Sequence, residues 1–277
     1  MTDGLLFHET DPIAPIKYVY RVQNVLHRER SDIQEIVVLE SEYFGRILVL
    51  DGVVQLTEKD EYLYHEMLTH VALHAHPSPE TVLIIGGGDG GTLREVAKHS
   101  AVKSIDLVEI DERVIEVSKQ FLPTVATSFG DRRLRIAAMD GAKFLDQTEQ
   151  SFDVIIIDST DPVGPAQALS TTEFYSNACR RLSPTGFLVA QTESLHFHRE
   201  FVADVQRRLA QLFDIVDLYT VPLATYAGNW WTFSIASKRY EPRKQARSCE
   251  VSTEHYSDDV HGHAFLPKSL YEKLIRQ

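Results

Sequence analysis

Carboxylate side chains follow four apolar stretches of this sequence, each close to the point where the stretch ends. The four acids are Asp89, Glu109, Asp140 and Asp158, and Asp161 follows three residues after the last of them. If the stretches are neighbouring strands of an open α/β sheet, their carboxyl ends meet at one edge, where ligands bind in such sheets. Like charges gathered closely are unfavourable unless a cation compensates them. The pattern therefore predicts a site for a positively charged ligand.

The first of these acids lies inside a glycine-rich turn, residues 86–91, between an apolar stretch and the helix-like residues 92–97. Glycines such as Gly86 and Gly88 let the backbone approach a bound nucleoside. A phosphate site at the start of a helix uses backbone N–H groups and is weakened by added negative charge. Asp89 therefore argues against a pyrophosphate, as in a dehydrogenase, and favours a sulfonium nucleoside that carries a free amine.

Each acid also has a structural alternative to a binding role. Glu109 lies 21 residues after the third glycine of the turn, the spacing at which an acid holds ribose hydroxyls, but it could be a surface acid. Asp140 could hold an adenine amino group or only form a turn. Asp158 and Asp161 could be helix caps or turn residues, and Asp89 a turn former. Together, Glu109 and Asp140 suit an adenosine. The other three acids, Asp89, Asp158 and Asp161, suit a ligand with several ammonium groups.

Histidines are the other residues that could bind or catalyse. His70 and His74 are four residues apart and could ligate a metal from one helix face, but no third ligand is evident. His196 and His198 are an equally weak candidate pair. We therefore expect no metal site, and no Ser-His-Asp arrangement can be placed from the sequence.

The composition limits the class of protein. The 277 residues are 43% hydrophobic, enough for one large domain or for a main domain with a small one. The formal net charge of -12 argues against a nucleic-acid-binding surface and suits a cationic small substrate. Cys179 and Cys249 are far apart in sequence, which favours a reduced, cytoplasmic chain. No stretch reads as a secretory leader or reaches the roughly 18 apolar residues of a membrane helix, so we expect no membrane partner.

The N-terminal part of the chain predicts a small antiparallel β unit. Residues 18–57 read as strands, and an Asp-Gly pair at 51–52 separates the apolar runs 46–50 and 53–56, which is a strong hairpin signal. The spacing of apolar residues then changes. Over residues 60–75 they recur every four positions, which predicts a helix with one buried face.

From residue 81 onward, strand-like and helix-like stretches alternate. The expected strands are 81–85, 104–108, 134–138, 154–157, 187–190, 215–219 and 231–236. This alternation predicts a doubly wound parallel sheet. The gap between the last two strands is too short for a parallel crossover, so they should be antiparallel neighbours. Residues 170–173 read as a capping box that opens a helix, and the polar residues 238–258 as a long surface connection.

Two segments, residues 86–95 and 158–162, resemble the hallmark motifs of the spermidine synthases, which are polyamine aminopropyltransferases. The resemblance extends over nearly the whole chain and includes residues 51–55, 58–61, 64–67, 225–226 and 264–267. Such long collinear matches are far more specific than a lone glycine-rich turn. The family transfers the aminopropyl group of decarboxylated S-adenosylmethionine to a diamine and releases methylthioadenosine.

The resemblance implies a Rossmann-like, methyltransferase-type α/β fold with a mostly parallel, doubly wound sheet. An N-terminal β-hairpin domain, residues 1–58, would serve oligomerisation and part of the substrate site, and residues 59–277 would form the catalytic domain. A homodimer or homotetramer is implied. Decarboxylated S-adenosylmethionine would be a co-substrate, and no tightly bound cofactor is expected.

The resemblance also implies roles for individual residues. The nucleoside would be held by Gln34, Gly86, Gly88, Asp89, Glu109, Asp140, Gly141 and Pro165. The diamine slot would be lined by Tyr64, His65, Asp89, Asp158, Asp161, Glu193 and Tyr226. Asp89 would pair with the aminopropyl amine, and Asp158 would be the catalytic base. Residues 159–172, which include glycine and proline, could form a lid over the site.

The acceptor and the reaction class each have alternatives. Bulky residues stand just after Tyr226, in the segment 224–231, where the family often has small ones. Putrescine leads because a short slot ending in acids suits a four-carbon diamine, but cadaverine, agmatine and spermidine stay open. A methyltransferase would share the glycine turn but would not need Asp89. A non-catalytic polyamine-binding protein would not need Asp158 and Tyr64.

The expected reaction needs no metal, because a sulfonium is already an activated leaving group. The attacking amine must be neutral, whereas an alkyl ammonium has a pKa near that of lysine, about 10.4. An aspartate with a pKa of about 3.9 is a poor base for it. We therefore expect Asp158 to orient the amine as well as to accept its proton, with burial raising its basicity.

Overall fold

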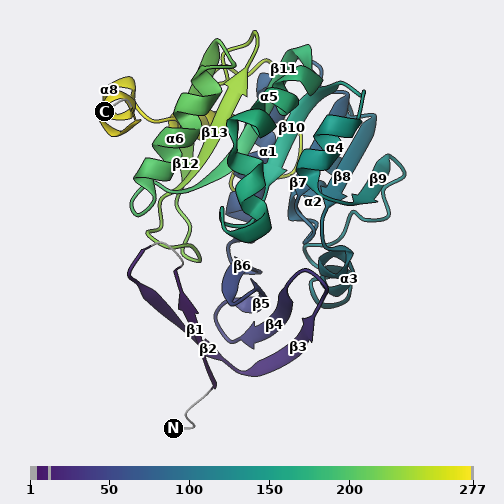
Figure 1. Cartoon of the computed structure of the whole chain (residues 1–277), viewed down its shortest axis with the longest axis vertical. Coiled ribbons are helices and arrows are strands. Elements are labelled where there is room, and N and C mark those ends of the chain that lie inside the picture. Colours follow the sequence, from purple (N-terminus) through teal and green to yellow (C-terminus); the bar gives the residue numbers. More distant parts are fainter. Residues whose placement is uncertain (1–4, 12–13, 276–277) are drawn as a thin grey trace.

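The computed structural model describes residues 5–11 and 14–275. Two antiparallel sheets form the N-terminal part, which lies below the main sheet in Figure 1. One pairs β1 (Leu5–Thr10) with β2 (Lys17–Val22), and the other runs in the order β3 (Asn24–Arg30), β4 (Glu35–Ser41), β5 (Gly45–Leu50) and β6 (Val53–Thr57). The expected hairpin is confirmed: Asp51 and Gly52 join β5 to β6 with φ angles of 46° and 85°, as a tight hairpin turn requires.

The main sheet has seven strands in the order β12-β13-β11-β10-β7-β8-β9. They are β7 (Thr81–Gly86), β8 (Ser104–Glu109), β9 (Leu134–Ala138), β10 (Phe152–Asp158), β11 (Leu182–Ser194), β12 (Ile215–Val221) and β13 (Trp231–Ser237). Strands β11, β10, β7, β8 and β9 are parallel, and β12 and β13 are antiparallel neighbours, as predicted. The strand order reverses between β7 and β10, and such a switch point leaves a crevice at the carboxyl ends of the strands.

Helices cover both faces of this sheet (Figure 1). They are α1 (Glu61–Ala75), α2 (Gly91–Ala97), α3 (Glu112–Phe121), α4 (Gly141–Gln147), α5 (Thr172–Arg181), α6 (Arg199–Ala210), α7 (Asp258–Ala264) and α8 (Lys268–Ile275). Alternate residues of β7 enter two different cores, Val82 and Ile84 on the face of α1, and Leu83 and Ile85 on the face of α4, α5 and α6. No helix in the described part of the chain has the length and apolar character needed to cross a bilayer.

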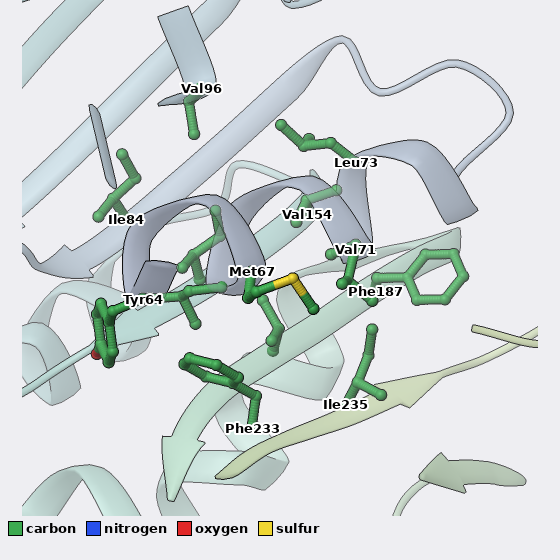
Figure 2. Packing of buried hydrophobic residues seen from close by; sticks show 14 of the residues in the cluster. Tyr64, Met67, Val71, Leu73, Ile84, Val96, Val154, Phe187, Phe233 and Ile235 are labelled. Carbon is green, nitrogen blue, oxygen red and sulfur yellow. The ribbon is translucent and has the colours of Figure 1, made fainter. Parts of the chain in front are cut away.

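The helix α1 is buried on nearly all sides, so the expectation of a single buried face was wrong. Figure 2 shows Met67 and Val71 pointing from α1 toward side chains of the sheet such as Phe233 and Ile235. On another side of the helix, Glu66 accepts backbone N–H bonds from residues 254–256. The apolar residues of α1 therefore account for only one of its buried faces. The other faces are buried because their polar side chains have partners elsewhere in the chain.

Of two predictions about connections, one needs correction and one is confirmed. The capping box is displaced by one residue, because Thr171 is the N-cap of α5 and its hydroxyl accepts the Phe174 N–H bond at 3.1 Å. Ser170 instead ends the short 3-10 helix η1 (Gly164–Ser170), and its hydroxyl donates to the Gln167 carbonyl. Residues 238–258 do run between β13 and α7 with mostly exposed or half-buried side chains, but the ring of Tyr256 is buried against α1.

The helix α3 joins the two parts of the molecule. Its residues Val114 and Val117 share a core with Ile36, Val38 and Leu48 of the N-terminal sheet. Burying each such aliphatic side chain contributes about 1.5–3 kcal/mol. This contact helps to hold the N-terminal sheet over the carboxyl ends of the main sheet, where the strand order reverses.

Candidate active site

A cavity of about 430 Å³ opens at the switch point between β7 and β10. The glycine-rich turn after β7 lines one side, and Leu48, Leu50 and Gln55 of the N-terminal sheet line another. The five carboxylates singled out in the sequence, Asp89, Glu109, Asp140, Asp158 and Asp161, all lie on its wall. The cavity is therefore built by both parts of the chain, at the place where the strand ends converge.

Asp158 ends β10 and lies in the cavity wall with only 9% of its surface exposed. Its Oδ1 accepts a hydrogen bond from the Tyr64 hydroxyl at 2.7 Å, and its Oδ2 accepts one from the Thr92 hydroxyl at 2.7 Å. Burial, and then the negative charge of Asp89, raise the pKa of Asp158 above its ordinary value. The carboxylate is thus held in place and made more basic than an exposed aspartate.

The glycine turn packs directly on the strand that carries Asp158. The Gly87 N–H donates to the Asp158 carbonyl at 2.9 Å, and Gly86 has a φ of 81°, in the left-handed region. A Cβ atom at Gly86 would lie 2.1 Å from that carbonyl oxygen, far inside van der Waals contact. Glycine is therefore required here for the approach of two backbone segments as well as for the turn itself.

Four alternating charges run into the cavity, and we call Arg94, Glu61, His65 and Asp89 the charge row. Arg94 donates two hydrogen bonds to Glu61, at 2.7 and 2.9 Å, and Glu61 Oε2 lies 2.5 Å from Nδ1 of His65. His65 Nε2 in turn lies 3.3 Å from Oδ1 of Asp89. An ammonium group of a ligand placed beside Asp89 would extend this alternation by one charge.

The protonation states along the charge row follow from these contacts. Burial opposes protonation of His65, but the carboxylates of Asp89 and Glu61 outweigh it and raise the pKa of His65 to about 10. Burial also acts to raise the pKa of Asp89, whereas His65 and the Gly91 N–H group more than offset it and lower that pKa. At neutral pH His65 is therefore an imidazolium and Asp89 is a carboxylate.

At the end of the cavity formed by β8 and β9, two acids contact the backbone. Glu109 accepts N–H bonds from Gly88 at 3.1 Å and Asp111 at 3.0 Å, and burial raises its pKa to about 7 although these bonds act in the opposite direction. Asp140 is the N-cap of α4 and accepts the Lys143 N–H bond at 3.0 Å. Asp140 therefore both caps α4 and lines the cavity.

The N-terminal sheet reaches the same end of the cavity through Gln34. Its side-chain amide donates to Oδ2 of Asp111 at 3.0 Å, which ties the sheet to the loop after β8. Apolar side chains such as Ile110 and Val114 lie between these polar groups on the wall. Apolar side chains combined with a few fixed polar groups are typical of a site for a small molecule.

A second, smaller cavity adjoins the first, and Tyr64 and Tyr226 line both. Its wall carries the carboxylates of Glu9, Asp11, Asp161 and Glu193. Burial, and then the charge of Glu193, raise the pKa of Asp161 to about 9, so that Asp161 is protonated at neutral pH. His198 Nδ1 lies 3.2 Å from Glu193 Oε2. This cavity combines carboxylates with one neutral acid and is suited to receive a cation.

Glu193 has an unusual backbone conformation. Its φ is 71°, in the left-handed region that residues other than glycine rarely adopt. It lies where the register of β11 against β13 shifts, between Gln191 and Ser194. Such a bulge redirects a side chain, and here it accompanies a carboxylate on the wall of the smaller cavity.

The segment after β12 is anchored beneath this cavity. Both the Ala224 and Thr225 N–H groups donate to Oδ2 of Asp60 at 3.0 Å. The Tyr226 hydroxyl donates to the Gln55 carbonyl, and the Tyr226 ring packs on Trp231 with 4.5 Å between ring centroids. Trp231, one of the bulky residues of segment 224–231, therefore forms part of the cavity wall.

The structure brings nearly all of the predicted site residues together. Those that line the main cavity are Gln34, Tyr64, His65, Gly86, Gly88, Asp89, Glu109, Asp140, Gly141, Asp158, Asp161 and Tyr226. Glu193 lines the smaller cavity. Pro165 is the second residue of η1, and its neighbours Gly164 and Ala166 line the main cavity, which places part of segment 159–172 beside the site.

Sequence reasoning missed Thr92, Glu61 and Arg94. All three lie in or next to recognised segments, but their roles depend on contacts between distant segments that no local pattern reports. Arg94 of α2 meets Glu61 of α1, and Thr92 of α2 meets Asp158 of β10. Thr92 and Glu61 are set apart by their burial, which is known only from the fold, so the sequence held no signal for them.

We expect Glu61→Gln to weaken the charge row. The pKa of His65 should fall from about 10 toward its ordinary value of about 6.5, because one of its two carboxylate partners is lost. Leaving Arg94 and His65 with one partner fewer should lower the free energy of unfolding by about 3 kcal/mol. NMR titration of the His65 ring measures the first effect and urea unfolding the second. Glu116→Gln, at an exposed ion pair, is the control.

The sign of the pH dependence follows from the raised pKa. Stabilisation from protonated His65 is fully present below the unfolded-state pKa of about 6.5 and is lost as pH rises through about 10. The difference in unfolding free energy between wild type and Glu61→Gln should therefore shrink over this range. An unchanged His65 pKa in the variant would contradict the role given to Glu61.

Comparison with known proteins gives consistent results. Residues 61–246 match the family model for the spermine/spermidine synthase domain, and residues 5–58 match that for the spermidine synthase tetramerisation domain. The chain is 55% identical over 271 residues to polyamine aminopropyltransferase 1 of Aquifex aeolicus (strain VF5), covering 98% of this chain and 97% of the relative. It is 43% identical over 258 residues to the polyamine aminopropyltransferase of Bacillus subtilis (strain 168), covering 92% and 94%.

Two solved structures are also similar. A spermidine synthase in complex with the transition-state analogue AdoDATO superposes with a TM-score of 0.92 at 35% identity, covering 98% of this chain and 95% of that one. The spermidine synthase of Thermotoga maritima superposes with a TM-score of 0.91 at 34% identity, covering 98% and 94%. The Rossmann-like fold with N-terminal antiparallel sheets is thus shared along nearly the full length.

Proposed function

Since the chain belongs to the spermine/spermidine synthase family and is a polyamine aminopropyltransferase, we propose that it is a spermidine synthase. It transfers the aminopropyl group of decarboxylated S-adenosylmethionine to putrescine and forms spermidine and methylthioadenosine. Decarboxylated S-adenosylmethionine is the co-substrate, and no tightly bound cofactor takes part.

One observation carries the proposal. The large cavity and the smaller acid-lined cavity adjoin at Tyr64 and Tyr226, and Tyr64 donates its hydrogen bond to Asp158. A nucleoside in the first cavity and a diamine reaching into the second would therefore meet beside Asp158. The acids of the smaller cavity would hold the far ammonium of such a diamine, which suits a short acceptor.

The nucleoside fits the walls of the larger cavity. Gln34, Glu109, Asp140 and Gly141 hold the thioadenosine, with Gly86 and Gly88 allowing its close approach, and the family resemblance adds Pro165. Asp89, paired with the imidazolium of His65, binds the ammonium of the aminopropyl group. The far ammonium of the diamine lies at Asp161 and Glu193.

The reaction is a single displacement. The neutral nitrogen of putrescine attacks the methylene carbon bound to the sulfonium, the carbon–sulfur bond breaks, and its electron pair neutralises the sulfur. Asp158, with its raised pKa, accepts the proton that the nitrogen loses and orients that nitrogen through its fixed carboxylate. Holding the two reactants in line contributes about 7–11 kcal/mol in favourable cases.

Release of methylthioadenosine from decarboxylated S-adenosylmethionine tests this function. Putrescine, cadaverine, agmatine and spermidine should be offered separately, and putrescine should give the highest kcat/KM. A preference for another amine would overturn the putrescine assignment, leave the mechanism standing and direct attention to segment 224–231. No release with any amine would overturn the proposal as a whole, in favour of a binding protein.

Replacing Asp161 with asparagine should selectively weaken acceptor binding. The pKa of Asp161 is about 9 in the free protein, so at pH 7 a bound diammonium should favour its ionised form and release a proton. We expect the variant to release less proton in calorimetry across buffers of different ionisation enthalpy, and the KM for putrescine to rise about 10- to 100-fold. Asp146→Asn, at an exposed acid, is the control. An equal loss of nucleoside affinity would contradict the role.

The chain forms a homo-oligomer, and a homotetramer is favoured over a homodimer by the match of residues 5–58 to a tetramerisation domain. Apolar side chains on the N-terminal strands, Leu5, Leu6, Val19 and Val25, are each more than half exposed in the single chain. Light scattering should give a mass near four times 31.4 kDa.

The free cysteines Cys179 and Cys249 favour the cytoplasm as the place where the enzyme works.

A further inference from the structure

Three histidines from two segments meet in the interior, away from the cavities. His70 and His74 lie one turn apart on α1, and His99 follows the end of α2. Their exposed fractions are 0%, 1% and 2%, and a ligand nitrogen from each lies within 4.8 Å of the others. The sequence offered no third ligand for the first two because His99 is 25 residues beyond His74.

His74 is the unusual member of this cluster. Neither of its ring nitrogens has a hydrogen-bond partner among the residues that the structure describes. Leaving a buried polar group unpaired costs about 1–3 kcal/mol, so such groups call for an explanation. The ring stacks on Tyr256 at 5.2 Å with an interplanar angle of 17°, and the ring of His99 is 5.0 Å away. The ring of His74 is thus held in place while both of its nitrogens lack a hydrogen-bond partner among the described residues.

The other two rings are arranged as metal ligands are. His70 Nε2 lies 2.9 Å from Oε2 of Glu95, and His70 Nδ1 lies 2.9 Å from His99 Nε2. A carboxylate that accepts the N–H bond of one ring nitrogen leaves the other nitrogen with its lone pair free, as around many bound zinc ions. Two nitrogens on one tetrahedral zinc are about 3.3 Å apart. The nitrogens of His70 and His99 need to separate by only a few tenths of an ångström, and a nitrogen of His74 lies within 4.8 Å of both.

We infer that His70, His74 and His99 form a site for a divalent transition-metal ion of the zinc class. Three imidazoles supply three of the four positions of a tetrahedral ion, and imidazole suits zinc, cobalt, nickel and copper. His99 would bind through Nε2 in the neutral tautomer that carries its proton on Nδ1. The ion would fasten α1, which carries Tyr64, to the end of α2.

The charges around the cluster are compatible with a cation. Glu95 supplies one negative charge beside His70, although Arg94 and Lys98 also pair with it. The Arg247 guanidinium, the cation on the other side, donates to the carbonyls of Leu73 and His76. Burial lowers the pKa of His74 to about 4 and that of His99 to about 2, so both rings are neutral at pH 7.

Metal binding to the full-length protein tests the inference. After treatment with a chelator and dialysis, Co(II) should give visible absorption of a four-coordinate ion at one equivalent per chain. Zn(II) should displace the Co(II) and raise the Tm by about 5 °C. His74→Phe keeps an aromatic ring against Tyr256 but removes both nitrogens, and it should lose the spectrum and the Tm shift. His263→Phe, at an exposed histidine, should keep both.

Two results would overturn the site: no stoichiometric binding to wild type, or equal binding to His74→Phe, which would indicate other histidines. If that variant does not fold, anomalous diffraction from wild-type crystals soaked in Zn(II) decides the question. A peak among the three rings supports the site, and a peak only elsewhere, or none, refutes it. These readouts do not depend on catalysis, so the outcome is independent of the proposed acceptor.

Discussion

Replacing Asp158 with asparagine should lower the rate of methylthioadenosine release by about 100- to 10,000-fold, the range that loss of a general base usually produces. The variant cannot accept the proton of the attacking amine. It can still form hydrogen bonds with the hydroxyls of Tyr64 and Thr92, which both contact Asp158 at 2.7 Å, so we expect it to fold. Single-turnover rates with decarboxylated S-adenosylmethionine and putrescine measure the effect.

The pH profile distinguishes a base from an orienting group. Burial and Asp89 raise the pKa of Asp158, so the rate in the wild type should rise with pH as this carboxylate ionises, and that limb should vanish in Asp158→Asn. Thr92→Ser keeps the hydroxyl that contacts Asp158 and is the matched control. Near-normal turnover of Asp158→Asn would remove this residue from the role of base.

Intact S-adenosylmethionine should bind about 100-fold more weakly than its decarboxylated form. Its extra carboxylate would lie near Asp89, and repulsion between two such charges at low effective dielectric amounts to about 3 kcal/mol after partial compensation by His65. Calorimetric titration of the two nucleosides gives the ratio of their dissociation constants. Comparable constants would contradict the assignment of Asp89.

The same residue can be tested by removing its charge. Asp89→Asn keeps a side-chain oxygen for the Gly91 N–H bond, which the wild-type carboxylate accepts at 2.7 Å. Both nucleosides then lose the partner of their ammonium group, but only the intact one is relieved of the repulsion between its carboxylate and Asp89, so the ratio between the two dissociation constants should shrink toward one. An unchanged ratio in the variant would show that selection against the carboxylate lies elsewhere.

Much of the fold could be predicted from the sequence because the patterns that indicate it lie within short segments. The hairpin at Asp51 and Gly52, the alternating strands and helices, and the antiparallel last pair are all confirmed. The acids converge because each follows a strand, and parallel strands end at one edge of a sheet. That inference needed only the strand positions.

The remainder depends on contacts between distant segments. Thr92 reaches Asp158 across 66 residues, and Glu61 meets Arg94 across 33. The all-round burial of α1 was missed because residues such as Glu66 and His70 read as polar, and only their tertiary partners permit their burial. The cap at Thr171 was misplaced because Ser170 offers the same hydroxyl one residue earlier.

The backbone of Glu193 places a limit on how stable this protein can become. A residue with a Cβ atom held at a φ of 71° costs of order 1–3 kcal/mol, which glycine would avoid. Selection for thermal robustness alone would therefore replace Glu193, yet its carboxylate forms part of the acid-lined cavity. Under the proposed binding of the acceptor in this cavity, folding and acceptor binding have opposing requirements at Glu193, and variants selected for heat resistance without substrate are expected to lose acceptor affinity here.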